Sequence, residues 1–355
     1  MFGLFSSKGP FNVKVATIEK TFSVEKGDNL LKAALDNKLA WPHDCRVGSC
    51  GKCRCRLISG KIKPLSDFSY VLNSEEMDSG MILACQTSLR SDVEIEVKID
   101  NPPAAISKPE TLEGVIASTR PLTHDILEVT IQVKSPFPKY LAGQYAEIVV
   151  PGLINKPRSY SFAKATDQAK KIHISVFVRH VPNGEFTTWL HSERREGQPV
   201  SVTGPFGSFW LRDSPNQILC IAGGSGMAPI KALLEQMVNN GVNKQVTYLF
   251  GARSQKDLYC LDELARIKKI FNGQFNFIPV LSQEPEDSNW DGLRGRCVDE
   301  IMNAHDFSSG TDAYLCGPPG MIDSAIEILN KNGLSNDNIF YDNFLDASNM
   351  QGGRA

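Results

Sequence analysis

The sequence contains no hydrophobic run of about 18 residues, the length that a helix needs to cross a membrane. It also lacks an excess of either charge, because 38 Lys and Arg residues are balanced by 40 Asp and Glu residues. Proteins that bind nucleic acids through the phosphate backbone usually carry a basic surface. We therefore expect neither a membrane-spanning segment nor a nucleic-acid partner.

A secretion signal and a disulfide framework are missing as well. Residues 1–5 are Met-Phe-Gly-Leu-Phe, which is too short for the core of a leader peptide and has no leading positive charge. Of the nine cysteines, five are scattered along the chain rather than clustered as in disulfide-stapled proteins, namely Cys55, Cys220, Cys260, Cys297 and Cys316. These observations predict a protein of the reducing cytoplasm.

The other four cysteines do follow a pattern. Cys45, Cys50 and Cys53 form C-x4-C-x2-C, and Cys85 follows further along the chain. This spacing is typical of a plant-type [2Fe–2S] cluster, whose two irons need four thiolates. Two glycines within the loop allow positive φ and a close approach to a cluster. Four buried cysteines without a metal and a zinc site are the alternatives, but zinc sites prefer paired C-x2-C units. These four cysteines are the predicted metal ligands.

The N-terminal region, residues 1–100, has the periodicity of a small α+β domain. Its hydrophobic residues predict a hairpin over 13–24, a helix near 30–35 and strands near 54–58 and 93–97. Residues 101–110 then contain three prolines, which predicts a semi-rigid linker.

Two further regions follow the linker. Residues 111–213 are rich in alternating segments such as 126–133 and 172–178, which predicts an antiparallel barrel. Residues 214–355 alternate between short apolar strands and helical segments. That pattern predicts a parallel sheet covered by helices on both faces.

The barrel region carries two motifs whose residue types suit ligand binding. In Arg158-Ser159-Tyr160-Ser161, Arg suits a phosphate, Tyr a planar ring and Ser a ring nitrogen. Downstream, a turn opens a helix whose N-terminal amides favour a pyrophosphate; its residues are Gly184, Glu185, Phe186 and Thr187. An ordinary capped helix is the alternative for this second motif.

The last region has two glycine-containing turns, each after an apolar strand. The first contains Gly223, Gly224 and Gly226 and leads to Pro229; it does not match G-x-G-x-x-G. The second is Cys316-Gly317-Pro318-Pro319-Gly320-Met321. Because open α/β sheets bind ligands at the carboxyl ends of their strands, the two turns together predict a nucleotide crevice. Tight strand–helix turns without a ligand are the alternative.

Taken in order, these motifs resemble the NAD(P)H-dependent reductase components of multicomponent oxygenases, of the phenol hydroxylase and benzoate dioxygenase reductase type. The resemblance rests on the four cysteines, 158–161, Gly204-Pro205-Phe206-Gly207-Ser208-Phe209, 223–229 and 316–321, and covers about residues 13–344. It implies a β-grasp ferredoxin domain, a six-stranded antiparallel FAD-binding barrel and a parallel α/β NAD(P)-binding domain.

The resemblance also implies roles for single residues. Arg158 would bind a flavin phosphate, Tyr160 would pack against the isoalloxazine, and Ser161 would lie near flavin N5. Cys316 would lie near the hydride-transfer position and Phe344 beside the flavin, so Ser161, Cys316 and Phe344 are the implied catalytic residues. Further cofactor-binding residues implied in the same way are Ser159, Gly184, Glu185, Phe186, Thr187, Gly223, Gly224, Gly226, Pro229, Arg253, Gly317 and Pro318.

The implied cofactors are a [2Fe–2S] cluster, FAD and NADH or NADPH. A nicotinamide gives electrons in pairs and the cluster takes them singly, whereas a flavin does both and must stand between them. The predicted function is electron delivery to a terminal oxygenase, hydroxylase or desaturase. Two alternatives stay open: a self-contained flavin oxidoreductase for a small substrate, and a redox-sensing protein that binds a partner. Arg253 and Lys256 suit a 2′-phosphate, yet NADH is the favoured donor.

Overall fold

The computed structural model of the chain describes residues 10–48, 50–99, 107–154, 156–166 and 172–344. Its contacts divide the chain into two compact units, residues 1–105 and 106–355. Most of the predicted linker, residues 101–106 of 101–110, lies outside the described residues. Over the described ranges, no helix is both long and apolar enough to cross a bilayer.

The first unit is a five-stranded sheet with a helix packed on it. The strand order is β2-β1-β7-β3-β5, in which β1 and β7 are parallel and the other pairs antiparallel. The strands are β1 (Phe11–Val15), β2 (Lys20–Val24), β3 (Arg54–Ser59), β5 (Met81–Leu83) and β7 (Val93–Glu96). Helix α1 (Leu30–Asp36) buries Leu30, Leu31 and Ala34 in the same core as Val13 and Val15. The expected β-grasp arrangement is confirmed.

Smaller elements complete this unit. The strands β4 (Ile62–Pro64) and β6 (Thr87–Leu89) pair with each other, and α2 (Ser74–Asp78) precedes β5. Periodicity did not predict α2, because five residues are too few to show a period. Its start is nevertheless encoded: Asn73 Oδ1 accepts from the Glu76 amide at 2.8 Å and Glu76 Oε2 accepts from the Asn73 amide at 2.9 Å, a capping box.

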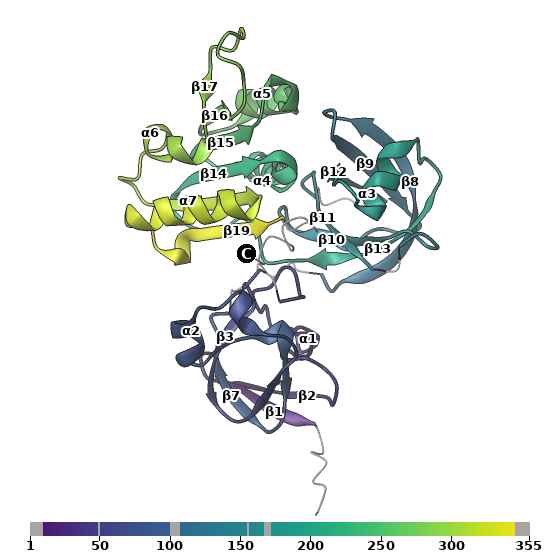
Figure 1. Cartoon of the computed structure of the whole chain (residues 1–355), viewed down its shortest axis with the longest axis vertical. Helices are drawn as coiled ribbons and strands as arrows, with labels where there is room; N and C mark the ends of the chain where they lie inside the picture. The colour runs from purple at the N-terminus through teal and green to yellow at the C-terminus, as the bar shows by residue number, and fades with distance from the viewer. Residues whose placement is uncertain (1–9, 49, 100–106, 155, 167–171, 345–355) are drawn as a thin grey trace, which may run out of the picture. The chain divides into compact units, whose positions relative to one another are not determined.

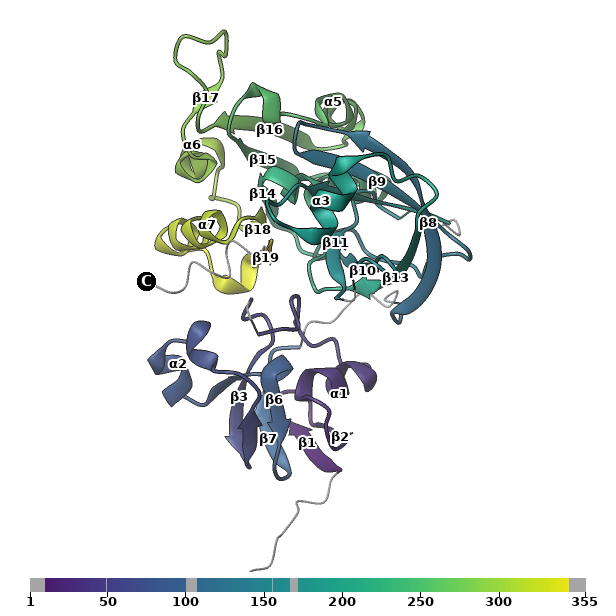
Figure 2. The same cartoon turned by 45° about the vertical axis from the view of Figure 1, so that its right-hand side comes forward.

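The second unit begins with an antiparallel six-stranded sheet in the order β11-β10-β13-β8-β9-β12. The strands are β8 (Glu110–Pro121), β9 (Ile126–Val133), β10 (Tyr145–Val149), β11 (Arg158–Ser161), β12 (His173–Arg179) and β13 (Pro199–Phe206). The two edge strands meet where Phe162 bridges Val176 and the Ala163 amide donates to the Ser175 carbonyl at 2.8 Å. The sheet is thus nearly closed into the predicted barrel, and helix α3 (Glu185–Ser192) packs against it (Figure 2).

The rest of this unit is a six-stranded parallel sheet in the order β17-β16-β15-β14-β18-β19 (Figure 1). Its strands are β14 (Gln217–Gly223), β15 (Gln245–Ala252), β16 (Gln274–Leu281), β17 (Leu293–Arg294), β18 (Thr311–Gly317) and β19 (Ile339–Asn343). Its helices are α4 (Met227–Asn239), α5 (Leu261–Ile270), α6 (Ile301–Ala304) and α7 (Pro319–Lys331).

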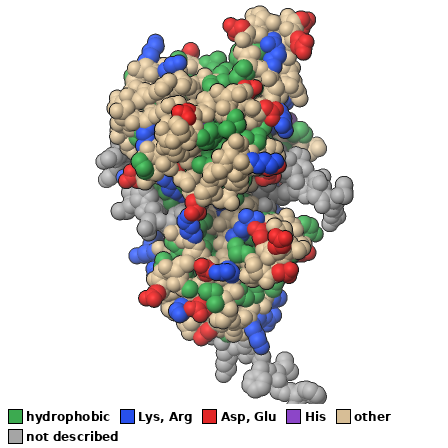
Figure 3. Space-filling model, turned by 90° about the vertical axis from the view of Figure 1, so that its left-hand side faces the viewer, with side chains coloured by type: hydrophobic (Ala, Val, Ile, Leu, Met, Phe, Trp, Pro, Cys, Tyr) green, Lys and Arg blue, Asp and Glu red, His purple; other side chains and the backbone are tan. Residues whose placement is uncertain are grey.

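Both faces of the parallel sheet are covered, as its apolar strands predict. Cys220 and Ala222 pack with α4 and α5, whereas their neighbours Leu219 and Ile221 pack with α7 on the opposite face. The first of these cores also contains barrel residues, among them Ala142, Ala163, Phe177 and Phe209. The barrel and the parallel sheet are therefore joined by one continuous hydrophobic core. On the face shown in Figure 3, acidic and basic side chains are interspersed without a field of one sign.

Candidate functional site

The four predicted cluster ligands lie together in the first unit as two pairs. The Cys50 amide donates to Cys45 Sγ at 3.3 Å, and the Cys45 amide donates to Cys50 Sγ at 3.5 Å. In the second pair, the Cys85 amide donates to Cys53 Sγ at 3.4 Å. A hydrogen bond between the Cys53 and Cys85 side chains raises the pKa of Cys53 and lowers that of Cys85. A pair of thiols is what each iron of a two-iron cluster requires.

The spacing of the sulfurs separates a two-iron cluster from a single ion. A tetrahedral zinc site with ligands at about 2.3 Å brings all four sulfurs to within about 4 Å of one another. Among the described residues, no three cysteine sulfurs lie within 4.8 Å of one another, and the one metal-like group of that size is His124, Asp125 and Asp257. The donor set therefore fits a [2Fe–2S] cluster and does not fit a mononuclear zinc ion.

Two loop glycines are required by the same arrangement. Gly48 has φ +83°, and a Cβ there would lie 2.6 Å from Gln86 Cγ. Gly51 has φ +71°, and its Cβ would lie 2.9 Å from Val71 Cγ1. Side chains at either position would push the loop away from the segments that face it.

In the second unit, β11 presents the predicted flavin-binding residues on the barrel. Arg158 is half-buried, with its guanidinium donating only to the carbonyls of Lys156 and Pro157 within the described contacts. Ser159 is exposed, and Tyr160 is half-buried with its ring 5.5 Å from that of Phe186. An accessible cation and an adjacent aromatic ring on one strand suit a phosphate and a planar ring system.

The turn before α3 differs from the expected one in the role of a threonine. The helix begins at Glu185 with Gly184 as its N-cap, and no described side chain caps it. Thr187 Oγ1 instead accepts from the Val181 amide at 3.1 Å and donates to nearby carbonyls, so this hydroxyl stabilises the turn itself. A Cβ at Gly184 would lie 2.6 Å from Thr187 Oγ1. The uncapped amides at the start of α3 suit an anion.

Three distant segments converge at the end of β11. Ser161 Oγ donates to Asp342 Oδ2 at 3.2 Å, and both side chains are buried. Asp342 lies on β19 in register with Cys316 on β18. The Phe344 amide donates to the Gly317 carbonyl at 2.9 Å. The structure thus brings Ser161, Cys316 and Phe344 to one place, together with Asp342.

The two glycine turns of the parallel sheet touch each other. A Cβ at Gly226 would lie 2.2 Å from the Cys316 carbonyl oxygen, and one at Gly317 would lie 3.0 Å from the Gly223 carbonyl oxygen. Tyr259 fixes the first turn by donating its hydroxyl hydrogen to the Gly224 carbonyl at 2.8 Å. Glycine is needed at both positions because the backbones of two strand ends lie so close together that a side chain would not fit between them.

A cavity of about 350 Å³ opens at the carboxyl ends of these strands. Four predicted nucleotide-binding residues line it: Gly223, Gly224, Arg253 and Pro318. Four others do not: Gly226 lies in the first turn, Pro229 in α4, and Cys316 and Gly317 at the end of β18. The barrel also contributes to the lining through Asp125 and Arg179. This is the position that the topology of an open α/β sheet favours for a ligand.

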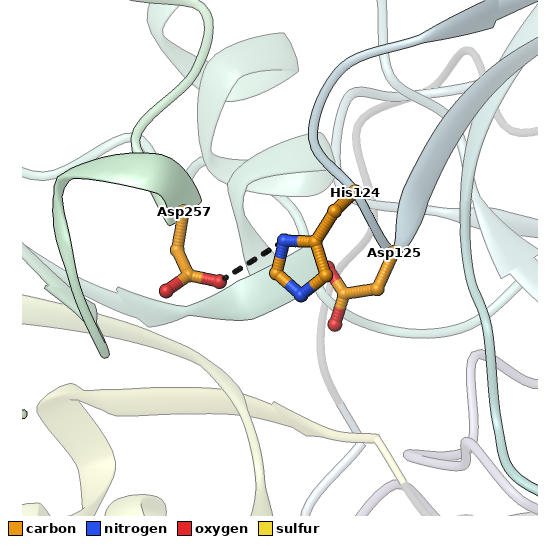
Figure 4. A group of neighbouring side chains, drawn as sticks. All are labelled: His124, Asp125 and Asp257. Atoms are coloured by element: carbon orange, nitrogen blue, oxygen red, sulfur yellow. Dashed lines mark ion pairs between the residues drawn. The ribbon is translucent and has the colours of Figure 1, made fainter.

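Asp125 is the centre of a charged network at the edge of this cavity. Its Oδ2 accepts from Arg253 at 3.0 Å and from Arg179 at 3.3 Å, and Arg253 also donates to Asp257 at 2.8 Å. Burial alone would raise the pKa of Asp125, but the Thr123 hydrogen bond and the two arginines outweigh it and lower that pKa. Figure 4 shows Asp125 and His124 from the barrel opposite Asp257 from the parallel-sheet domain. The arginines already neutralise these carboxylates.

Three residues of the site escaped the sequence-based prediction. Asp342 has no motif of its own and is identified only by its contact with Ser161. Arg179 ends β12, and its Nη1 lies 3.9 Å from the position a Cβ would take on Gly224. Tyr259 acts on the Gly224 carbonyl from 35 residues away. The position of Arg179, at the end of an alternating segment and before the turn that opens a helix, was the sole available signal for it, and none was available for the other two.

The fold and the site define a chain with separate places for an iron–sulfur cluster, a flavin and a nicotinamide nucleotide. Three family models match it: a 2Fe-2S iron-sulfur cluster binding domain over residues 13–90, an oxidoreductase FAD-binding domain over 113–210 and an oxidoreductase NAD-binding domain over 220–327. The chain belongs to the family of iron–sulfur flavoprotein reductases that are the reductase components of multicomponent oxygenases.

Particular relatives span nearly the whole chain. The xylene/toluene monooxygenase electron transfer component XylA of Pseudomonas putida is 36% identical over 96% of both chains. The phenol 2-monooxygenase reductase component DmpP of Pseudomonas sp. strain CF600 is 31% identical over 96% of both. Among solved structures, the Amycolatopsis cytochrome P450 reductase GcoB is 29% identical with a TM-score of 0.78, covering 95% of this chain and 99% of that one.

Proposed function

We propose that this chain takes electrons from NAD(P)H and delivers them one at a time to a terminal oxygenase, hydroxylase or desaturase. When bound, FAD accepts a hydride and releases its electrons singly, and the [2Fe–2S] cluster passes them on. The observation that carries the proposal is the arrangement of four thiols in two pairs. A chain that reduced a small substrate at its own flavin would have no use for a one-electron centre.

The geometry supports the following residue assignments. Cys45 and Cys50 would hold one iron, and Cys53 and Cys85 the other. Arg158, Ser159 and Tyr160, with the α3 start formed by Gly184, Glu185, Phe186 and Thr187, would hold FAD. The cavity residues Gly223, Gly224, Arg253 and Pro318 would contact the nicotinamide nucleotide, and the packed residues Gly226, Pro229 and Gly317 would shape the turns behind them.

Five further residues are assigned to the reaction centre and its surroundings. Ser161, Cys316 and Phe344 would face the flavin and nicotinamide, with Asp342 holding the Ser161 hydroxyl in place. Arg179 would add a cation for the pyrophosphate, because it reaches the Gly224 turn from the barrel side.

The domain boundaries that suit these roles are 1–100, 111–213 and 214–355, with 101–110 as the linker. The division of contacts at residue 105 supports the first boundary.

The acceptor would be an oxygenase that works on a hydrocarbon or a phenol. This is supported by relatives named for xylene/toluene, phenol and propane monooxygenases. The protein would act in the cytoplasm, where NAD(P)H is regenerated.

Cofactor analysis and turnover test the proposed function. Protein prepared anaerobically should contain about one FAD, two irons and two acid-labile sulfides per chain, and NADH should bleach both chromophores. It should also sustain NADH-dependent reduction of cytochrome c. Fast turnover excludes a sensor that only reports cluster state, whereas colourless protein without iron or flavin would contradict the proposal.

Replacing Ser161 by Ala is expected to slow NADH-dependent flavin reduction by about 10- to 100-fold, the cost of a lost hydrogen bond to a charged partner. Flavin content should not change, because the hydroxyl donates to Asp342 and makes no described contact with Arg158. Anaerobic stopped-flow measurement at 450 nm, roughly the flavin maximum, checks this. Ser118→Ala, an exposed serine of β8, is the matched control and should behave like the wild type. Equal rates for both variants would refute the role of Ser161.

NADH is expected to be used at least about tenfold more efficiently than NADPH, a difference of about 1.4 kcal/mol. Arg253 lines this cavity and could bind a 2′-phosphate, but its guanidinium already donates to Asp125 and Asp257. The additional 2′-phosphate of NADPH would bring more negative charge against these carboxylates. Steady-state kcat/KM with each nucleotide measures the preference, and Asp257→Asn should narrow it. A preference for NADPH would show that Arg253 is released from its partners.

A further inference from the structure

The segment after β11 is fastened to both halves of the second unit. On the barrel side, the Ala163 amide donates to the Ser175 carbonyl at 2.8 Å, and the Tyr140 hydroxyl donates to the Lys164 carbonyl at 3.1 Å. On the other side, helix α4 supplies a donor and an acceptor. Lys231 Nζ donates to the Ala163 carbonyl at 3.1 Å, and Glu235 Oε2 accepts from the Ala165 amide at 2.9 Å.

Lys231 and Glu235 form an ion pair one helical turn apart on α4. The Lys231 side chain is only 4% exposed, and that of Glu235 is 28% exposed. A buried ammonium group is costly unless a counter-charge and hydrogen bonds compensate it, and here both are present. Gln236 adds a third tie, because its Oε1 accepts from the Ala142 amide at 3.0 Å. We call Lys231, Glu235 and Gln236 the α4 clamp.

The clamp connects the two halves of the proposed reaction centre. At one end, Ala163 lies two residues after Ser161, which meets Asp342. At the other end, α4 begins at Met227, directly after the turn formed by Gly223–Gly226. Apolar contacts of α4, such as those of Met227 and Ile230, stabilise the interface but have no preferred direction. Directional bonds to three backbone groups fix the register of the helix against the barrel.

We propose that Lys231 and Glu235 are positioning residues for hydride transfer. They hold the nucleotide-binding turn at a fixed distance and angle from the Ser161 strand, although neither residue lines the cavity. Because reacting atoms must approach closely and in line, a small displacement of α4 lowers the rate of transfer more than it lowers nucleotide affinity. This inference rests on the proposed function.

The experiment compares variants of the full-length, FAD-loaded protein in anaerobic stopped flow with NADH. Lys231→Met keeps the apolar stem and removes the donor. It should lower the limiting rate of flavin reduction by about tenfold or more and leave the Kd for NADH within about twofold. Hydrogen–deuterium exchange of peptides covering residues 158–166 should increase, in FAD-loaded and FAD-free protein alike. Glu235→Gln should have a smaller effect of the same kind, because it still accepts from Ala165.

Lys331→Met is the matched control, since Lys331 and Glu327 form an exposed pair of the same spacing on α7; it should match the wild type. An unchanged limiting rate in Lys231→Met overturns the proposal. So does a rate that falls only in step with FAD content and Tm, which would indicate general loosening. If Lys231→Met does not fold, Glu235→Gln decides by the same criteria. A wild-type protein that NADH does not reduce would instead contradict the proposed function.

Discussion

Replacing Cys50 by Ser is expected to abolish electron delivery to cytochrome c while NADH still reduces the flavin. Cys50 pairs with Cys45, and a serine hydroxyl is a poor iron ligand at neutral pH, so one iron would lose half of its protein thiolates. The cytochrome c rate should fall at least about 100-fold. Loss of a direct ligand should cost at least as much as the largest losses seen when a group that hydrogen-bonds to a metal ligand is removed. Ferricyanide reduction, which the flavin can sustain directly, should persist. Iron, sulfide and both rates measure the outcome.

Cys55→Ser provides a control of the same chemistry two residues beyond Cys53. Cys55 is buried on β3, where burial raises the pKa of its thiol, and it belongs to neither sulfur pair. This variant should keep its iron and its cytochrome c activity even if it is somewhat less stable. Should Cys50→Ser retain full cytochrome c activity, the cluster would not be on the electron path. The chain would then be a self-contained flavin oxidoreductase.

Replacing Gly226 by Ala is expected to have a similarly large effect on the other side of the electron path. The Cβ of this alanine would lie 2.2 Å from the Cys316 carbonyl oxygen. The two atoms would overlap, and because the oxygen belongs to the backbone, only a movement of the backbone can separate them. The movement would separate the two turns and displace the start of α4. We expect NADH-dependent flavin reduction to fall about 100-fold, as for other displacements of about 1 Å at a reacting centre. Stopped-flow reduction at several NADH concentrations gives the rate and the Kd.

Gly320→Ala separates this effect from a general intolerance of change near the cavity. Gly320 also lines the cavity, but a Cβ there meets no atom within 4 Å. The residue lies in the first turn of α7, where alanine is favoured over glycine. Both variants should bind FAD, whose residues lie on the barrel. A normal reduction rate in Gly226→Ala would mean that the contact between the turns is not needed for hydride transfer.

The features that the sequence predicted well depend on neighbours along the chain. The C-x4-C-x2-C loop contains three of the four proposed ligands within one short segment, so its spacing is informative before any folding is known. The parallel sheet could be predicted because strands such as β14 are apolar throughout, and the barrel because strands such as β9 alternate. Element types were therefore confirmed, whereas α2 was too short to produce a period.

Other predictions gained detail from the structure, because a local motif does not show which groups its side chains will meet. The Thr187 hydroxyl bonds within its own turn, so its proposed role toward a pyrophosphate is to shape that turn. Arg253 suits a 2′-phosphate by its chemistry, but folding places it against Asp125, which is 128 residues away. Sequence position alone gives no measure of such competition between partners.

The amino-acid order by itself determined which kinds of group this protein holds: thiolates at cluster spacing, a strand that suits a flavin, and two strand ends that suit a nucleotide. Only the tertiary structure decided how they are combined. Ser161 meets Asp342 from 181 residues away, and α4 ties the barrel backbone to the nucleotide-binding turn. The reason is physical: ligand spacing and periodicity are properties of a short segment, whereas hydrogen bonds between distant segments exist only once the hydrophobic core has brought them together.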